Sequence, residues 1–120
     1  MDFPYNNLEE LSKIKSKLVR NLVTNKKYRD KNQLFILESL KCIDEARNKK
    51  IEFFVLCENH KNFESNLEFL VNNFPDSEKY LLNEKEFNDI SPFSTSQGIF
   101  AILNYNSLKI NELATDKAAI

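Results

Sequence analysis

The sequence has few of the residues that make a chain flexible, crosslinked or metal-binding. Its 120 residues include one glycine, three prolines, two cysteines and no tryptophan. The single glycine excludes a glycine-rich phosphate loop, and the shortage of glycine and proline favours a compact domain over modules joined by flexible linkers. Cys42 and Cys57 make no disulfide framework, and we expect both to be buried. The length fits one domain with a single core.

Long hydrophobic runs are also missing. No apolar stretch approaches the roughly 20 residues that cross a bilayer, so we expect no membrane partner. The first residues, Met1 to Asn7, have neither the basic nor the apolar region of a signal peptide. Together these features predict a cytoplasmic protein.

Histidine is present once, as His60. The segment Cys57-Glu58-Asn59-His60 has the spacing of half a zinc site, but the sequence has no second pair to complete it. We therefore expect no metal. A nucleophilic pair of Cys57 and His60 remains one alternative, which would make the protein a small enzyme.

Positive charge is concentrated in one segment. The net charge is −1, yet residues 13–31 hold eight of the 17 basic residues and one acid. This segregation indicates an anionic partner. Lysine and arginine there can neutralise phosphates, and a tyrosine can stack on an unpaired base. A solvated helix face in a lysine-rich protein would look the same, so composition leaves both interpretations open. The candidate RNA-binding residues are Arg20, Lys26, Lys27, Tyr28, Arg29 and Lys31.

A second candidate is the polar segment 91–98, which contains Ser94, Thr95, Gln97 and the only glycine, Gly98. Hydroxyl and amide groups can bind phosphate or ribose oxygens, and glycine permits close backbone approach. The alternative is a turn that needs glycine for a positive φ angle.

Hydrophobic spacing predicts alternating helices and strands. Leu8, Leu11 and Ile14 recur at helical spacing, and Asn25 could end that helix or cap a short turn through Lys31. The pattern predicts an α/β fold, a three-layer α/β/α sandwich with a small, roughly four-stranded sheet. The expected elements are a helix over 8–23, a strand over 33–38, a helix over 40–49, a strand over 51–57, a helix over 63–74, a strand over 79–82, a helix from 83 and a strand over 98–103.

Two segments resemble a known family. Lys27-Tyr28-Arg29 followed by Leu34-Phe35-Ile36-Leu37-Glu38 resembles the opening of the N-terminal substrate-binding domain of SpoU/TrmH-type (SPOUT superfamily) RNA 2′-O-ribose methyltransferases. Residues 94–101, Ser-Thr-Ser-Gln-Gly-Ile-Phe-Ala, resemble the strand that closes that domain. The resemblance covers roughly residues 13–103. It departs at Ser39, where the family usually has glycine, and at Ser96, where proline often precedes Gln-Gly.

The resemblance implies a fold similar to ribosomal kink-turn-binding proteins and a structured RNA partner, tRNA or rRNA. In the family, a C-terminal knotted domain binds S-adenosylmethionine, catalyses methyl transfer and forms the homodimer. Its signatures do not occur in this sequence, so we expect no catalytic residue and no bound cofactor here. Residues 1–104 would be the RNA-binding domain, and 105–120 a linker toward an absent catalytic domain. The alternative is a stand-alone RNA-binding or protein-interaction module without methyltransferase activity.

Overall fold

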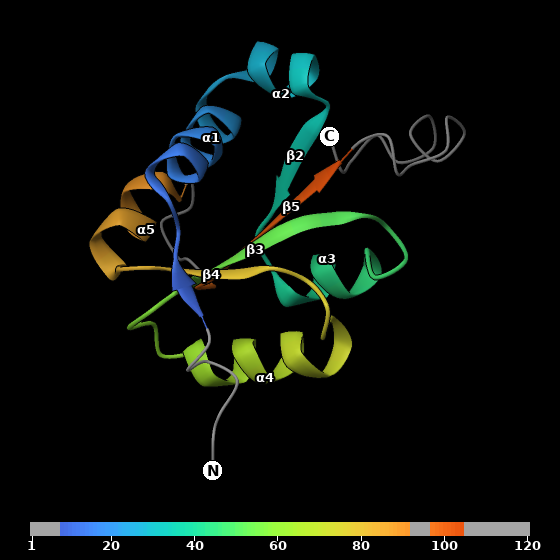
Figure 1. Ribbon diagram of the computed structural model, residues 1–120, viewed down its shortest axis with the longest axis vertical. Helices are drawn as coiled ribbons and strands as arrows, with labels where there is room; N and C mark the ends of the chain where they lie inside the picture. The colour runs from blue at the N-terminus through green and yellow to red at the C-terminus, as the bar shows by residue number, and fades with distance from the viewer. Residues whose placement is uncertain (1–7, 92–96, 105–120) are drawn as a thin grey trace.

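A computed structural model describes residues 8–91 and 97–104, which form one sheet covered by helices on both faces (Figure 1). The α/β prediction is confirmed, although the sheet has five strands instead of roughly four. In chain order the elements are β1 (Glu9–Glu10), α1 (Lys13–Thr24), α2 (Lys26–Asn32), β2 (Leu34–Leu37), α3 (Leu40–Glu45), β3 (Ile51–Cys57), α4 (Phe63–Asn73), β4 (Lys79–Leu82), α5 (Glu84–Ile90) and β5 (Ile99–Asn104).

The strand order is β1-β4-β3-β5-β2. The β1, β4 and β3 strands are parallel, whereas β5 runs antiparallel to both of its neighbours, β3 and β2. Leu37 pairs with Ala101 near one end of β5, and Leu34 pairs with Asn104 at the other. The start of β5 therefore lies beside the end of β2, and this arrangement decides which loops are neighbours.

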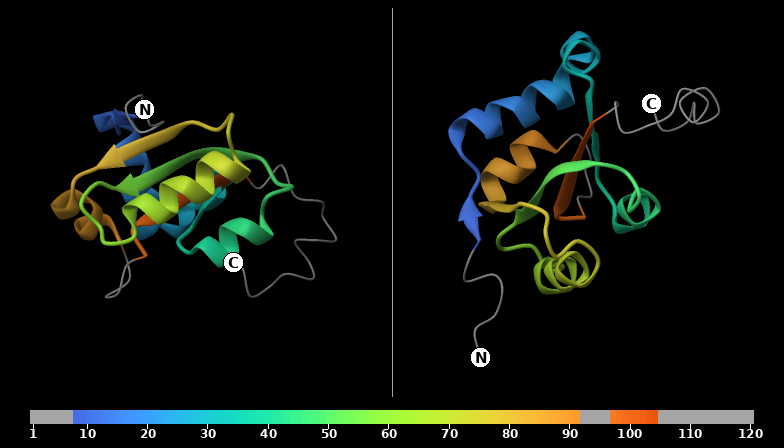
Figure 2. Two further views of the ribbon diagram at one scale, coloured as in Figure 1. Left: turned by 90° about the horizontal axis from the view of Figure 1, so that it is seen from below. Right: turned by 45° about the vertical axis from the view of Figure 1, so that its right-hand side comes forward.

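The sheet separates two hydrophobic cores, because alternate side chains of a strand point to opposite faces. Phe53, Val55 and Cys57 face the core under α1 and α5, whereas Phe54 and Leu56 face the core under α3 and α4. The two helix layers are visible on either side of the sheet (Figure 2). In the first core the rings of Phe87 and Phe100 stack with centroids 4.3 Å apart. None of the described helices has the length and apolarity to cross a membrane.

The first predicted helix begins later than expected. Residues 8–12 are not helical, because Glu9 and Glu10 pair with β4 at the sheet edge and the Leu11 N–H donates to the Leu81 carbonyl at 2.8 Å. Ser12 then caps α1 by accepting from the Lys15 N–H at 3.1 Å. The later start changes which residues face inward. Ile14, expected on the apolar face, is 84% exposed.

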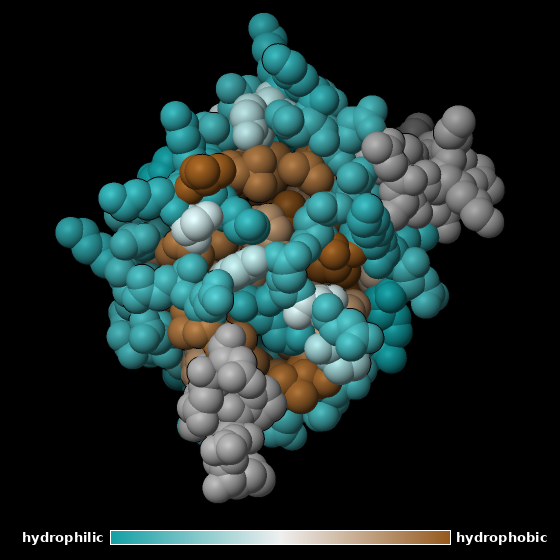
Figure 3. All heavy atoms as spheres, viewed as in Figure 1, coloured by the Kyte–Doolittle hydropathy of each residue, from teal (hydrophilic) through white to brown (hydrophobic). Residues whose placement is uncertain are grey.

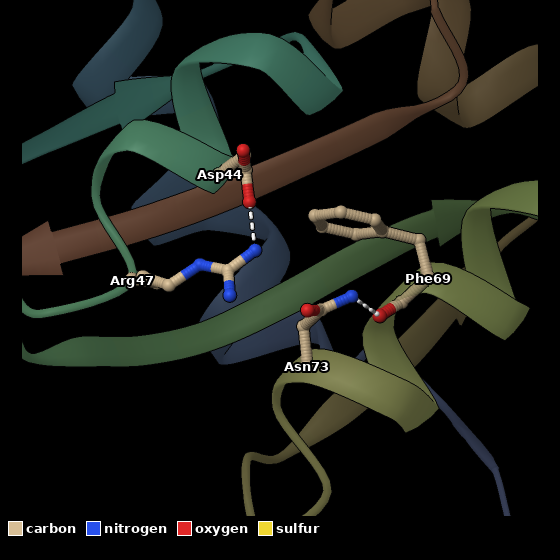
Figure 4. A network of polar contacts seen from close by, with 4 residues as sticks. All are labelled: Asp44, Arg47, Phe69 and Asn73. Atoms are coloured by element: carbon tan, nitrogen blue, oxygen red, sulfur yellow. Dashed lines mark hydrogen bonds and ion pairs between the residues drawn. The ribbon is translucent and has the colours of Figure 1, made fainter.

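The predicted helix over 40–49 is shorter than expected and ends at Glu45. Lys49 and Lys50 therefore follow a turn instead of completing the last helical turn. Figure 4 shows the turn residue Arg47 paired with Asp44, opposite the end of α4. The expectation that both cysteines are buried is wrong for Cys42, which is exposed because Ile43 and Ala46 occupy the inward face of the segment.

Candidate nucleic-acid interface

The basic segment folds as a sharp junction between α1 and α2. Asn25 both ends α1 and begins α2, so the two predicted alternatives are realised together. Its N–H donates to the Asn21 carbonyl at 2.9 Å, and its Oδ1 accepts from the Tyr28 N–H at 3.1 Å. The α2 helix ends at Asn32 and is capped by Gln33, whose left-handed φ of 55° turns the chain into β2. Local capping thus fixes the direction of α2 relative to α1.

Two of the predicted binding residues face the inside of this junction. Tyr28 is half-buried and packs against the core under α1 and α5. The Arg29 Nη1 donates to the Leu22 carbonyl at 2.6 Å and to the Val23 carbonyl at 3.4 Å. Both carbonyls belong to the last turn of α1, where intrahelical donors are missing. Neither side chain is therefore fully available to a ligand.

The remaining predicted cations of the segment point to solvent. Arg20, Lys26, Lys27 and Lys31 are exposed, and within the described part of the chain no ion pair involves them. Lys13 and Lys17 are also exposed on α1. Figure 3 shows hydrophilic side chains over α2, at the top of the view. This surface can attract an anion, because its charges are exposed and no ion pair among residues 8–91 and 97–104 neutralises them.

The second candidate segment is described only in part. Ser94 and Thr95 lie outside the described residues. The side chain of Gln97 is exposed, while its backbone carbonyl accepts from the Asn66 Nδ2 at 3.0 Å. Asn66 is 2% exposed, so its amide anchors the end of the segment from inside the fold.

Gly98 has a structural role in the same segment. Its φ of 81° and its contact with His60 leave no room for a side chain, since a Cβ there would lie 2.5 Å from the histidine Cγ. The Gly98 carbonyl accepts from the Cys57 N–H at 2.9 Å. The other end of the segment is held as well, because the Ser91 hydroxyl donates to Glu38 Oε2 at 2.8 Å. The positive φ that the turn interpretation requires of this glycine is therefore present.

Of the second candidate segment's binding residues, only Gln97 is described, and it does not lie beside the basic segment. Lys31 precedes the start of β2, beside Asn104, whereas Gln97 precedes the start of β5. Five residue steps along β5 correspond to roughly 17 Å. A ligand bound at the α1–α2 junction would have to extend along the sheet to reach Gln97.

The chemistry at Cys57 and His60 does not favour nucleophilic catalysis. Cys57 is fully buried, and burial raises the pKa of its thiol, which disfavours the reactive thiolate. The His60 Nδ1 accepts from the Asn62 N–H at 2.9 Å and so helps form the turn before α4. Among the described residues, no group of three or more histidine, cysteine or acidic side chains is placed to hold a metal ion.

One feature of the surface is not evident from the basic segment alone. The α5 helix lies beside α1 on the same face of the sheet (Figure 1). It carries the exposed acids Glu84, Glu86 and Asp89. The positive surface therefore has a negative border, which limits where a polyanion can lie. The acid-rich sequence of α5 is the signal that could have predicted this border.

Comparison with protein families identifies one match. A family model described as the MRM3-like substrate binding domain matches residues 13–101, which include both candidate segments. A search of curated protein sequences finds no match.

Several solved structures share the fold. An AdoMet-bound rRNA methyltransferase from Sinorhizobium meliloti is 24% identical, with a TM-score of 0.57 over 81% of this chain and 35% of its own. An RNA 2′-O ribose methyltransferase is 17% identical, with a TM-score of 0.62 over 86% of this chain and 39% of its own. The SpoU methyltransferase AviRb from Streptomyces viridochromogenes is 10% identical, with a TM-score of 0.58 over 82% of this chain and 36% of its own. The chain thus spans little more than a third of these structures.

Proposed function

The chain belongs to the family of MRM3-like substrate binding domains, and from this we propose that it holds structured RNA, tRNA or rRNA, for a larger RNA methyltransferase. The predicted resemblance to the substrate-binding domain of SpoU/TrmH-type enzymes is confirmed by the family match and by the shared fold. The observation that carries RNA binding is the exposed positive surface of the α1–α2 junction, whose cations make no ion pair with any residue that the structure describes.

The binding mode follows from which charges are exposed. Arg20, Lys26, Lys27 and Lys31 would contact phosphates and release counterions. Tyr28 would have to stack on a base with the part of its ring that the core leaves exposed. The segment containing Ser94, Thr95 and Gln97 would act as a second contact, reached only by an RNA that extends along the sheet.

The methyl transfer itself would belong to the rest of the larger protein. One structural relative is described as AdoMet-bound and another as a 2′-O ribose methyltransferase. We therefore propose an S-adenosylmethionine-dependent 2′-O-ribose methyltransferase as the parent, which would dimerise through its catalytic domain. Residues 105–120 would link the two domains. The cytoplasmic location stays a prediction.

A salt titration of RNA binding tests the proposal. We expect affinity for a structured RNA, such as a tRNA transcript, to fall steadily as salt rises, because bound phosphates displace counterions. Substituting Lys27→Ala should reduce the slope of log affinity against log salt by about 0.7–0.9, the value for one lost phosphate contact.

The matched control is Lys41→Ala. Lys41 is also exposed, but it lies on α3, which covers the opposite face of the sheet. The control should leave the slope unchanged. Equal effects of the two substitutions would show attraction by overall charge instead of a site. A folded chain that binds no RNA at low salt would contradict the proposal and favour the protein-interaction alternative.

A further inference from the structure

Arg29 differs from its basic neighbours in what its guanidinium contacts. It ties the middle of α2 to the end of α1 through the carbonyls of Leu22 and Val23, at 2.6 and 3.4 Å from Nη1. Those carbonyls are six and seven residues earlier in the chain and have no intrahelical donors. A cation at a helix C-terminus is also favoured by the helix dipole. The contact is therefore both a hydrogen-bonded and an electrostatic restraint on the junction.

Other contacts add to the order of α2 and of its junction with α1. Asn25 caps α2 through its side chain while its N–H bonds back to α1. The Asn32 Nδ2 donates to the Tyr28 carbonyl at 2.9 Å, and the Tyr28 ring packs on the core. A helix of seven residues would not hold its shape by propensity alone. The local caps, the Arg29 contact with α1 and the packing of Tyr28 on the core must therefore supply the order of α2.

We propose that Arg29 is a positioning residue for RNA binding, which holds α2 against α1 so that Lys26, Lys27 and Lys31 present their charges in a fixed arrangement. This inference rests on the function proposed above for the segment. A site that is ordered before the ligand arrives loses less conformational entropy on binding. Arg29 then contributes to affinity through the backbone of the junction, and its phosphate-binding role predicted from charge is replaced by this one.

The distinction is measurable because a lost charge and a lost restraint change salt dependence differently. A residue on a phosphate contributes to counterion release, so its removal lowers the salt slope. A positioning residue leaves the number of bound phosphates unchanged. Its removal therefore lowers the affinity at every salt concentration without changing the slope of log affinity against log salt. Hydrogen exchange at the α2 amides reports the order of the junction independently of RNA.

The experiment uses the full chain and a tRNA transcript, with three variants whose folding is checked by circular dichroism. Arg29→Ala removes the restraint and a charge, Asn25→Ala loosens the junction without changing any charge, and Lys27→Ala removes an exposed charge only. We expect Arg29→Ala and Asn25→Ala to accelerate exchange in α2 and to weaken RNA binding about three- to tenfold at every salt concentration, with an unchanged slope. Lys27→Ala should lower the salt slope and leave hydrogen exchange in α2 unchanged.

Two results would overturn the inference. A reduced slope in Arg29→Ala, equal to that of Lys27→Ala, would place Arg29 on a phosphate. Faster exchange in Arg29→Ala and Asn25→Ala with unchanged affinity would show that order at the junction does not matter for binding. If the unaltered chain binds no RNA, the proposed function fails, and with it the role of Arg29 in RNA binding. The hydrogen-exchange data still decide whether Arg29 holds α2 against α1.

Discussion

His60 and Gly98 are in such close contact that a Cβ added to the glycine would lie 2.5 Å from the Cγ and 2.7 Å from the Nδ1 of the histidine ring. His60 comes from the turn after β3, and Gly98 comes immediately before β5. Since these strands are neighbours in the sheet, the contact fixes how the loop after β3 meets the loop before β5.

The first prediction concerns Gly98→Ala. The positive φ of 81° and the contact with His60 should together make this substitution cost about 2–4 kcal/mol of unfolding free energy. Chemical denaturation measures the cost directly. In a His60→Ala background the ring contacts at 2.5 and 2.7 Å disappear and the contact with the Cβ of residue 60 at 3.0 Å remains, so the same glycine substitution should cost less, closer to the conformational part of about 1–2 kcal/mol. Equal costs in the two backgrounds would show that the histidine ring moves aside.

The second prediction concerns the ionisation of Tyr80. Its hydroxyl hydrogen-bonds Glu78, and this bond raises the pKa of Tyr80 to about 12. The unfolded chain loses the corresponding proton near pH 10, so the folded state binds more protons between about pH 10 and 12. Tyr80 therefore stabilises the fold below pH 10, and this contribution is lost as the pH rises toward 12.

Ultraviolet absorbance of tyrosinate follows this titration. Tyr80→Phe should remove the phenol that titrates near pH 12, and Glu78→Gln should bring the pKa of Tyr80 back toward 10 because the carboxylate acceptor is lost. If Glu78→Gln leaves the titration where it was, the hydrogen bond to Glu78 does not cause the shift.

The third prediction tests the revised orientation of α1. Ile14 is 84% exposed, whereas Leu22 on the same helix is fully buried. We expect Ile14→Ala to change the free energy of unfolding by less than about 0.5 kcal/mol, and Leu22→Ala to lower it by about 2–5 kcal/mol. Urea denaturation of both variants makes the comparison. A large loss in Ile14→Ala would support the helix over 8–23 that hydrophobic spacing predicts.

Local patterns predict the buried strands well and the sheet edge poorly. The β3 strand has the expected bounds, Ile51–Cys57, because a continuous apolar run specifies a buried strand. The β1 strand, Glu9–Glu10, was missed because two glutamates carry no strand pattern, and only pairing with β4 makes them a strand. Leu8 and Leu11 then continued an apparent helical spacing that the edge pairing interrupts.

Candidate binding residues can be chosen from the sequence by their chemistry, but their placement cannot be predicted from it. The charge pattern identifies Lys26, Lys27 and Lys31, which are exposed as expected. It cannot separate Arg29 from them, because the carbonyls that Arg29 reaches depend on the angle between two helices. The separation of Gln97 from the basic segment follows from the antiparallel position of β5, and strand order is not encoded in local periodicity.

The last prediction concerns the acidic border on α5. The α5 helix lies beside the positive α1 helix and exposes three acids, Glu84, Glu86 and Asp89. These acids should repel RNA phosphates that extend from the α1–α2 junction toward α5. Replacing all three with their amides should strengthen RNA binding several-fold at low salt, and the gain should shrink near 1 M salt, where the Debye length is about 3 Å.

The control is Glu64→Gln with Glu68→Gln, because these exposed acids lie on α4 across the sheet. An equal gain in the control would mean that total charge, and not the border, governs binding. Measuring both variants on tRNA and on single-stranded RNA of equal length shows whether the border also selects the shape of the ligand.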